Sequence, residues 1–317
     1  MASPPTIDDI ENARARIRGS AIRTPLVRLN ANTGTTEVYL KLENLQPIGS
    51  FKLRGAGNAM LQATPEQLKN GVYTASAGNM AQGVAWHARR LGVPCTVIVP
   101  DHAPETKLAA IERLGARYVQ IPFSEWWQVL SDRHFPGQEG FFIHPVSDPA
   151  VMAGNGTIAL EILEDLPDVD AVLVPYGGGG LSVGIATVLR AMKPDTKTYA
   201  TEVESGAALA AAWEVNEPTA ISYHASFVDG IGSGRVLDEM WPQVRSLLDG
   251  ALVVSLKQVA AAIRVLAERN RVIAEGAGAA PVAAALAGKA SGDKIVCIVS
   301  GGNIDLAKIV DIFNGKV

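Results

Sequence analysis

Short apolar, strand-like runs alternate with stretches of helical periodicity along most of this chain, and no other feature limits its fold as strongly. The pattern predicts strands at 72–75, 96–100 and 117–121, and helices at 54–62, 80–91 and 105–114. These strands are apolar at almost every position, which indicates that both faces of the sheet are covered. We therefore expect an α/β protein built on open, twisted, mostly parallel sheets with helices on both sides.

The same alternation resumes after a less regular segment in the middle of the chain. Residues 123–138 are expected to form a short helix and a loop, and residues 210–252 a long irregular excursion. Further helices are predicted at 6–18, 154–166, 182–192, 256–274 and 279–286, and further strands or extended pieces at 24–29, 38–42, 171–175, 198–201 and 294–300. Two such series favour two lobes with a ligand cleft between them.

Composition excludes several function classes. The 317 residues are 48% hydrophobic and carry a net charge of -4 with no basic run, so no nucleic-acid partner is expected. The N-terminus lacks the basic start and apolar core of a signal peptide, and no apolar run approaches the roughly 20 residues that span a bilayer. Cys95 and Cys297 lie in apolar runs and are expected to be buried. These features favour a cytoplasmic protein without membrane contact.

Four consecutive glycines, Gly177 to Gly180, stand between a predicted strand and a predicted helix. Without side chains in the way, the backbone N–H groups can turn toward an anion, and the helix adds its positive N-terminal end. The junction therefore suits a phosphate group. The Lys-Ser/Thr signature of a P-loop is missing, as is an acidic residue in register for the ribose of a dinucleotide. A glycine turn that merely packs closely against a neighbour is the alternative.

Lys52 lies within Gly-Ser-Phe-Lys-Leu-Arg-Gly at 49–55, a turn that directly follows a strand and can hold an amine in a cleft. Two further junctions, Ser-Ala-Gly-Asn at 76–79 and Ser-Gly-Gly-Asn at 300–303, also join strand ends to helices. The first suits a carboxylate. Ligands of open α/β sheets gather at such carboxyl ends of strands. We interpret Lys52 as the carrier of a cofactor; the alternative is an ordinary solvated surface lysine.

These four motifs, in this order, resemble the fold type II pyridoxal-phosphate enzymes, and most closely their threonine/serine dehydratase and serine racemase group. The resemblance covers nearly the whole chain and implies a two-lobed fold like that of the tryptophan synthase β chain. It implies a large domain at 1–48 and 146–317 that binds pyridoxal 5'-phosphate, and a small domain at 49–145 that closes over the substrate. It also implies a homodimer, which is the family's habit.

The resemblance assigns a role to each motif. Lys52 would carry the cofactor as a Schiff base and act as the base at the substrate's Cα. The other cofactor contacts would come from Phe51 at the ring, Asn79 at the phenolic oxygen, Gly177, Gly178, Gly179, Gly180 and Leu181 at the phosphate, Glu275 on the cofactor side of the cleft, and Ser300 at the pyridine nitrogen. The substrate would lie against Ser76, Ala77, Gly78, Asn79 and Met80. The implied reaction is β-elimination from threonine, serine or a bulkier 3-hydroxy amino acid, such as an arylserine or 3-hydroxyaspartate, to a 2-oxo acid and ammonia.

Departures from the family's pattern modify this expectation. Ala77 stands where the racemases place a serine as second acid/base, so dehydration is expected over racemisation. Met80 replaces the usual histidine, which favours a wider or more apolar specificity unless it only fills a gap. In the family's metal loop Glu202 and Gly206 match but Ala208 does not, so a divalent metal is doubtful. No regulatory domain is expected after the 300–303 motif.

Other conspicuous residues receive structural interpretations. The histidines show no metal or catalytic spacing: His87, His102, His134, His144 and His224. Trp126 and Trp127 are expected to lie in the core or in an interface. Glu161 belongs to an acidic run and is expected to lie on a solvated helix face. Three alternatives to the dehydratase are an amino-acid racemase on the same fold, a non-catalytic metabolite-binding protein and a nicotinamide oxidoreductase.

Overall fold

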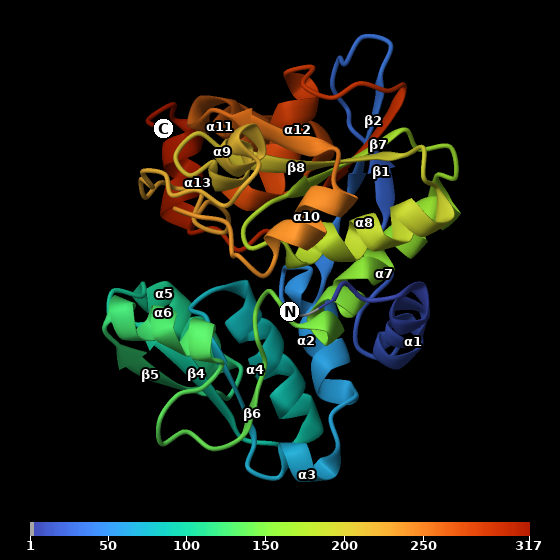
Figure 1. Ribbon diagram of the computed structural model, residues 1–317. Helices are drawn as coiled ribbons and strands as arrows, with labels where there is room; N and C mark the ends of the chain where they lie inside the picture. The colour runs from blue at the N-terminus through green and yellow to red at the C-terminus, as the bar shows by residue number, and fades with distance from the viewer. Residues whose placement is uncertain (1–2) are drawn as a thin grey trace.

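The computed structural model describes residues 3–317 and contains two bodies, each built on its own sheet (Figure 1). In the larger sheet β1 pairs with β2 in antiparallel fashion, and the other neighbours pair in parallel. Its spatial order is β1 (Leu26–Arg28), β2 (Glu37–Lys41), β10 (Lys294–Ile298), β7 (Ala171–Pro175), β8 (Lys197–Val203) and β9 (Gly250–Val254).

The smaller sheet is parallel throughout and uses only strands between residues 72 and 142. Its order is β5 (Arg117–Ile121), β4 (Cys95–Pro100), β3 (Val72–Ala75) and β6 (Phe141–Phe142). The expected α/β class with mostly parallel sheets is confirmed. The domain boundaries after residues 48 and 145 stay a prediction.

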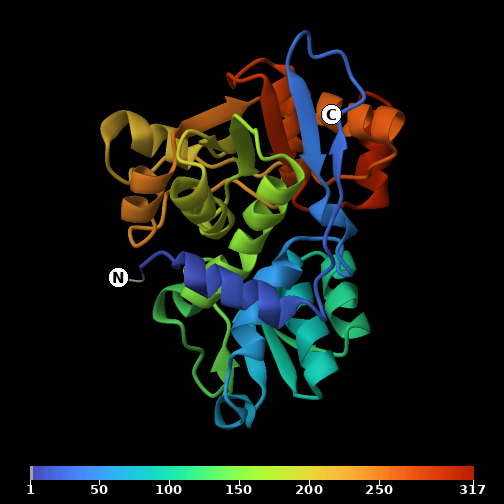
Figure 2. The same cartoon turned by 90° about the vertical axis from the view of Figure 1, so that its right-hand side faces the viewer.

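Helices cover both sheets, and the view turned by 90° keeps α2 to α6 together in the smaller body (Figure 2). Capping boxes at Thr6 and Ser255 explain why α1 and α11 begin where they do. The helices are α1 (Ile7–Ile17), α2 (Lys52–Leu61), α3 (Pro65–Leu68), α4 (Asn79–Leu91), α5 (Glu105–Arg113), α6 (Phe123–Asp132), α7 (Pro149–Asp165), α8 (Gly180–Met192), α9 (Ala208–Val215), α10 (Trp241–Leu247), α11 (Leu256–Val265), α12 (Gly276–Leu286) and α13 (Leu306–Phe313), with a 3-10 turn at Glu43–Leu45 and a π-turn at Leu266–Asn270.

The central strands of the larger sheet are buried on both faces. On β7, Val172 and Val174 pack into one apolar cluster and Leu173 into the cluster on the opposite face. This alternation is the period of two that a strand imposes. Cys297 of β10 and Cys95 of β4 are free and buried, as their apolar runs predict.

The prediction that 210–252 is irregular is wrong in part, because α9, α10 and β9 lie within or overlap that range. The N-terminus of α9 is capped from a distance: the carboxylate of Glu202, on β8, accepts hydrogen bonds from the backbone N–H groups of Leu209 and Ala210 at 2.8 Å each. Because the capping carboxylate lies seven residues before Leu209, the N-cap position itself holds no Ser, Thr, Asp or Asn. The local sequence therefore does not indicate where the helix begins. The predicted helix at 256–274 also ends early: Val265 closes α11, and the π-turn follows.

The solvated face predicted for Glu161 is also wrong. Glu161 lies on α7 and is 6% exposed. It accepts hydrogen bonds from Arg54 Nη1 at 2.6 Å and from Lys41 Nζ at 2.6 Å, and Arg54 in turn binds Glu43. These four side chains form one buried network of two positive and two negative charges, which we call the ion cluster.

The ion cluster fixes α2 against α7 and β2. Glycine permits the close packing of the two helices, because a Cβ on Gly154 of α7 would collide with the backbone carbonyl oxygen of Arg54. Since Lys52 is the first residue of α2, this packing determines where its side chain begins. No helix within residues 3–317 is both long and apolar enough to cross a bilayer.

Candidate active site

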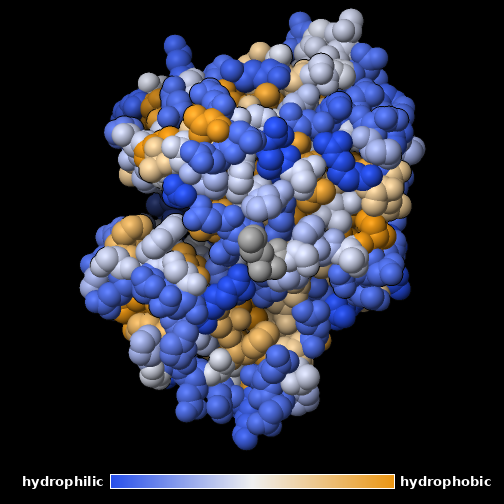
Figure 3. Space-filling view, in the orientation of Figure 1, coloured by the Kyte–Doolittle hydropathy of each residue, from blue (hydrophilic) through white to orange (hydrophobic). Residues whose placement is uncertain are grey.

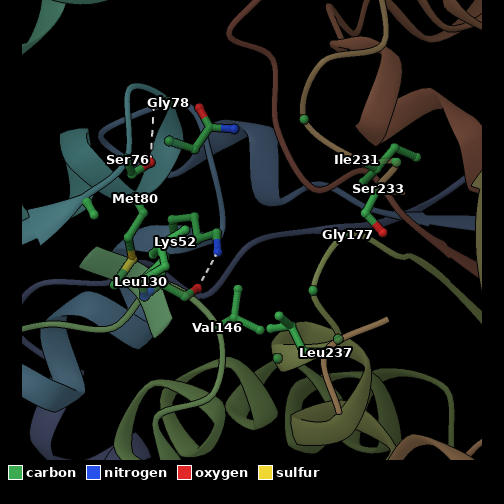
Figure 4. Close-up of a pocket in the computed structure, with 18 of the residues that line it drawn as sticks. Lys52, Ser76, Gly78, Met80, Leu130, Val146, Gly177, Ile231, Ser233 and Leu237 are labelled. Carbon is green, nitrogen blue, oxygen red and sulfur yellow. Dashed lines mark hydrogen bonds between the residues drawn. The ribbon is translucent and has the colours of Figure 1, made fainter. Parts of the chain in front are cut away.

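A cavity of about 670 Å³ lies between the two bodies. The space-filling view shows the hollow where the halves meet (Figure 3), and the close-up shows side chains that enter it from both sides (Figure 4). The sequence-predicted site residues that line it are Phe51, Lys52, Ser76, Ala77, Gly78, Asn79, Met80, Gly177, Gly178, Gly179, Gly180, Leu181, Glu275 and Ser300. The fold therefore brings all the motifs to one cavity.

The Lys52 side chain points into this cavity from the start of α2. Its Nζ donates to the carbonyl oxygen of Pro145 at 2.7 Å and lies 5.2 Å from the centroid of the Phe51 ring. Burial lowers the pKa of Lys52 from 10.5 to about 8, because the charged amine loses its hydration. A lysine with such a pKa supplies a neutral amine near physiological pH, which a nucleophile or a base at carbon needs.

The turn before Lys52 is joined to the C-terminal motif. The backbone N–H of Phe51 donates to the carbonyl oxygen of Ser300 at 2.9 Å, and Ser50 forms an isolated antiparallel bridge with Gly301. Ser50 Oγ also accepts from the N–H of Lys52 at 3.2 Å. Two motifs that are about 250 residues apart in the chain thus form one side of the cavity.

The glycine run forms a cradle at the N-terminus of α8. Gly179 caps the helix with φ +97, a backbone conformation that side chains other than glycine rarely adopt. A Cβ on Gly178 would come within 2.6 Å of the Val146 side chain, and a Cβ on Gly180 within 2.6 Å of the Val146 carbonyl oxygen. Only glycines fit here, and they leave the helix N-terminus facing the cavity, which suits a phosphate group.

Asn79 joins the 76–79 loop to two other motifs. Its Nδ2 donates to Glu275 Oε1 at 2.8 Å, and its Oδ1 accepts from Asn303 Nδ2 at 2.8 Å. An amide nitrogen carries two hydrogens, so the second N–H of Asn79 remains for a ligand oxygen. Within the loop, Ser76 Oγ accepts from the N–H of Gly78 at 3.2 Å.

Glu275 is a buried carboxyl group that faces the same cavity. Burial, with the nearby charge of Asp229, raises the pKa of Glu275 to about 7. Nothing in the local sequence around residue 275 marks such a group, so it was found only through the family resemblance. Its carboxylate takes up the space a side chain would need at residue 301, since a Cβ on Gly301 would lie 2.5 Å from Glu275 Oε1.

Sequence reasoning missed two parts of the cavity. The first is the segment around Pro145, which supplies the acceptor for Lys52. The second is α6, because Trp126 and Trp127 line the cavity instead of lying wholly in a core or an interface. The periodicity of α6 shows that one face is apolar but gives no sign of what that face meets.

The buried histidines have structural contacts. His87 Nε2 lies 3.0 Å from the Leu53 carbonyl oxygen. His144 lines the cavity, but its Nδ1 accepts from the N–H groups of Val146 and Ser147 at 3.1 and 2.9 Å. Burial lowers the pKa of each ring to about 4, so both are neutral at pH 7.

A family model described as "Pyridoxal-phosphate dependent enzyme" matches residues 17–301 of this chain. The chain belongs to this family of pyridoxal-phosphate-dependent enzymes. The expected cofactor is thereby confirmed, and the glycine cradle, the Lys52 amine and the free N–H of Asn79 fit its phosphate, aldehyde and phenolic oxygen.

Individual relatives show which group within this family the chain resembles. An L-threonine ammonia-lyase of Thermotoga maritima is 38% identical over 315 residues, which are 98% of this chain and 78% of that protein. A catabolic L-threonine dehydratase of Staphylococcus aureus is 37% identical over 313 residues, 96% of this chain and 90% of that protein. Among solved structures, maize serine racemase superposes with a TM-score of 0.91 at 32% identity, covering 99% of this chain and 98% of its own. The expected threonine/serine dehydratase and serine racemase group is confirmed.

The loop at 202–208, which resembles the family's metal loop, caps a helix in this enzyme. Both carboxylate oxygens of Glu202 accept hydrogen bonds from the start of α9, and Ala208 is the first residue of that helix. Within the described part of the chain, no three His, Cys, Asp or Glu side chains lie close enough to hold a metal ion. The donors do not fit a divalent cation, which wants several free oxygen ligands.

The pKa of Lys52 predicts how the apoenzyme takes up its cofactor. Only the neutral amine attacks an aldehyde, so the rate of cofactor uptake should rise about tenfold per pH unit below pH 8 and level off above it. Stopped-flow absorbance after mixing apoenzyme with pyridoxal phosphate checks this between about pH 6 and pH 10. Because Glu275 titrates near pH 7, Glu275→Gln serves as the control and should keep the plateau near pH 8. A rate that still climbs tenfold per unit at pH 10 would contradict the lowered pKa.

Proposed function

We propose that this protein is a pyridoxal-phosphate-dependent ammonia-lyase that dehydrates a 3-hydroxy amino acid to a 2-oxo acid and ammonia. The single observation that carries the proposal is the buried Lys52 amine, with its pKa of about 8, directed into a cavity that also holds the glycine cradle. The relatives named threonine dehydratase and ammonia-lyase support the reaction class.

Residues of both bodies would hold the cofactor. In this proposal the backbone of Gly177 to Leu181 would hold the phosphate, Phe51 would pack against the ring, Asn79 would donate to the phenolic oxygen and Ser300 would meet the pyridine nitrogen. Glu275 accepts a hydrogen bond from Asn79 and so fixes the orientation of its amide. When bound, the cofactor withdraws electrons from the substrate's Cα, and a hydroxyl at its nitrogen makes it a weaker electron sink than a carboxylate would, which favours β-elimination.

The chain's own residues then bind the substrate and move one proton. The Ala77 N–H and the Ser76 hydroxyl would hold the substrate carboxylate, because the N–H groups of Ser76 and Gly78 already donate to the Ile98 carbonyl oxygen and to Ser76 Oγ. The neutral Lys52 amine would take the proton from Cα. The Cα–H and Cβ–O bonds break and a carbon–carbon double bond forms. The hydroxyl leaves as water after gaining one proton, which balances the proton that Lys52 takes from Cα, so the net loss is one water. The released enamine tautomerises to an imine, which water hydrolyses to the 2-oxo acid and ammonia.

Racemisation is the second candidate, and the serine racemase structure favours it through its TM-score of 0.91. A racemase needs an acid on the face of Cα opposite the lysine. Ala77 offers no titratable proton at the loop position where the family's racemases carry a serine, so elimination is the stronger proposal. Membership in the family leaves the nicotinamide oxidoreductase and the non-catalytic binding protein without support.

The test measures oxo acid and ammonia from a panel of 3-hydroxy amino acids of both C3 configurations, with racemisation followed in the same samples. We expect a yellow protein that releases oxo acid and ammonia in equal amounts, and a cofactor that borohydride fixes to Lys52. Exchange of the Cα proton with inversion and without oxo acid would favour the racemase, and cofactor fixed at another lysine would refute the site.

Two further proposals concern the domains of the chain and its oligomeric state. We infer that residues 1–48 and 146–317 form the cofactor-binding domain and that residues 49–145 close over the substrate, because the cavity lies between the two sheets. We also propose that the enzyme acts as a homodimer in the cytoplasm. Light scattering of the holoenzyme tests the dimer.

A further inference from the structure

The smaller body presents an apolar surface to the cavity. It consists of Met80 from α4 and Phe123, Trp126, Trp127 and Leu130 from α6, and we call it the apolar wall. The spacing of 3, 4 and 7 residues places the four α6 side chains on one helix face, a pattern that usually meets a protein core. Here Phe123 and Trp127 are 52% and 46% exposed, so these two rings form the open part of the wall, whereas Met80 is 1% exposed.

The aromatic rings of the wall are fixed by one another and by the backbone. Phe123 and Trp126 stack with centroids 5.7 Å apart and planes inclined by 24°, and Trp127 lies 6.4 Å from Trp126. Trp126 Nε1 donates to the Ile98 carbonyl oxygen at 3.1 Å, so its only polar atom is already used. The wall therefore offers a ligand apolar ring surface and no strong polar contact from Trp126.

The larger body faces the wall with aliphatic side chains. Val146, Ile231, Val236 and Leu237 line the cavity from that side. In Figure 4 Met80 and Leu130 lie beside Lys52, Val146 lies near the Lys52 amine, and Leu237 lies further across the cavity. A group on the substrate's Cβ, one bond beyond the carbon that Lys52 deprotonates, would enter the space between these apolar surfaces.

Two of the described cations that line the cavity are paired with carboxylates, whereas the carboxyl group of Glu275 accepts from Asn79. Lys107 Nζ lies 2.7 Å from Asp229, and Arg235 Nη2 lies 2.8 Å from Asp238. Of the described cations that line the cavity, Lys52 is reserved for the chemistry and the other two already have carboxylate partners. A second substrate carboxylate, as in 3-hydroxyaspartate, would meet only cations whose charge a carboxylate of the protein already balances.

We propose that the apolar wall is a side-chain subsite, which makes the substrate a 3-hydroxy amino acid with an aromatic ring at C3. This inference rests on the proposed function. For 3-phenylserine the Cα–H and Cβ–OH bonds break, one water leaves, and hydrolysis of the resulting imine gives phenylpyruvate and ammonia. A methyl group or hydrogen at C3, as in threonine or serine, would leave the ring faces of Phe123 and Trp127 in water.

The test compares kcat/KM of the cofactor-loaded enzyme for L-threonine, L-serine and both C3 isomers of 3-phenyl-L-serine. We expect one phenylserine isomer to exceed threonine by at least about tenfold, since each further methylene in an apolar pocket is worth roughly 10- to 200-fold. The Phe123→Ala/Trp127→Ala double variant should lower this preference about tenfold or more. Phe313→Ala, at an equally exposed aromatic residue outside the cavity, should leave it unchanged.

A binding measurement separates recognition from turnover. L-phenylalanine and L-alanine lack a leaving group, and we expect the former to bind at least about tenfold more tightly, with the difference lost in the double variant. A higher kcat/KM for threonine overturns the inference and leaves the proposed function standing. A phenylserine preference that survives in the double variant overturns the assignment to the wall. Oxo acid from none of the four substrates overturns this inference, and the proposed function fails with it only if the wider panel of 3-hydroxy amino acids, including 3-hydroxyaspartate, also gives no oxo acid.

Discussion

Replacing Lys52 with alanine is expected to lower kcat for oxo-acid formation by more than about 10³-fold, because we propose Lys52 as both the attachment point of the cofactor and the base at Cα. Among its described contacts the amine has no carboxylate partner: it donates to the Pro145 carbonyl oxygen and lies over the Phe51 ring. Its loss should therefore leave the fold intact. Steady-state oxo-acid release measures the first effect, and the melting temperature of the apoprotein measures the second.

Lys52→Arg separates charge from basicity. Arginine keeps a cation at this position but does not lose its proton in a protein, so this variant should be as inactive as the alanine variant. If either variant kept activity within tenfold of the parent enzyme, another residue would be the base, and the assignment of Lys52 would be wrong.

Replacing Arg54 with alanine should destabilise the protein by about 3 to 5 kcal/mol, because it breaks a buried charge network by removing one partner. Arg54 donates to Glu43 at 2.8 and 2.9 Å and to Glu161 at 2.6 and 2.9 Å, and all three side chains are buried. Without it, Lys41 alone would face two buried carboxylates. Urea titration of the holoenzyme measures the change in free energy of unfolding.

Arg23→Ala provides the matched control. Arg23 also pairs with two carboxylates, those of Glu164 and Asp165, but its side chain is 47% exposed. Ion pairs in water contribute little, so this loss should stay below about 1 kcal/mol. Equal losses for the two variants would show that the ion cluster contributes no more than a surface pair.

The ion cluster also connects stability to the active site. Although burial opposes ionisation of Glu43, the charge and hydrogen bonds of Arg54 hold the pKa of that carboxyl below its usual value. Glu43 follows β2, Arg54 is two residues beyond Lys52, and Glu161 is on α7, so the cluster holds the start of α2 in place. A helix fixed in this way keeps Lys52 at one position in the cavity.

Much of the fold could be predicted from the sequence. The strands at 72–75, 117–121 and 171–175 have the predicted bounds, since each is a short run of strand-forming residues between breakers. The strand-to-helix junctions could also be predicted from the sequence, because glycines and a lysine that follow a strand indicate a turn at the carboxyl end of the sheet, where ligands bind. The family and its cofactor followed from those junctions.

The sequence by itself therefore determined the α/β class and the cofactor, and it placed the glycine run and Lys52 at strand ends, while the role of Lys52 as the reactive amine stays a prediction. Only the tertiary structure decided that Glu161 is buried, that Glu202 caps α9, and that the aromatic face of α6 lines a cavity. Local periodicity reports which face of an element is apolar or charged but not what lies against it. Partners more than 100 residues apart, such as Arg54 and Glu161, meet only when α2 and α7 pack together.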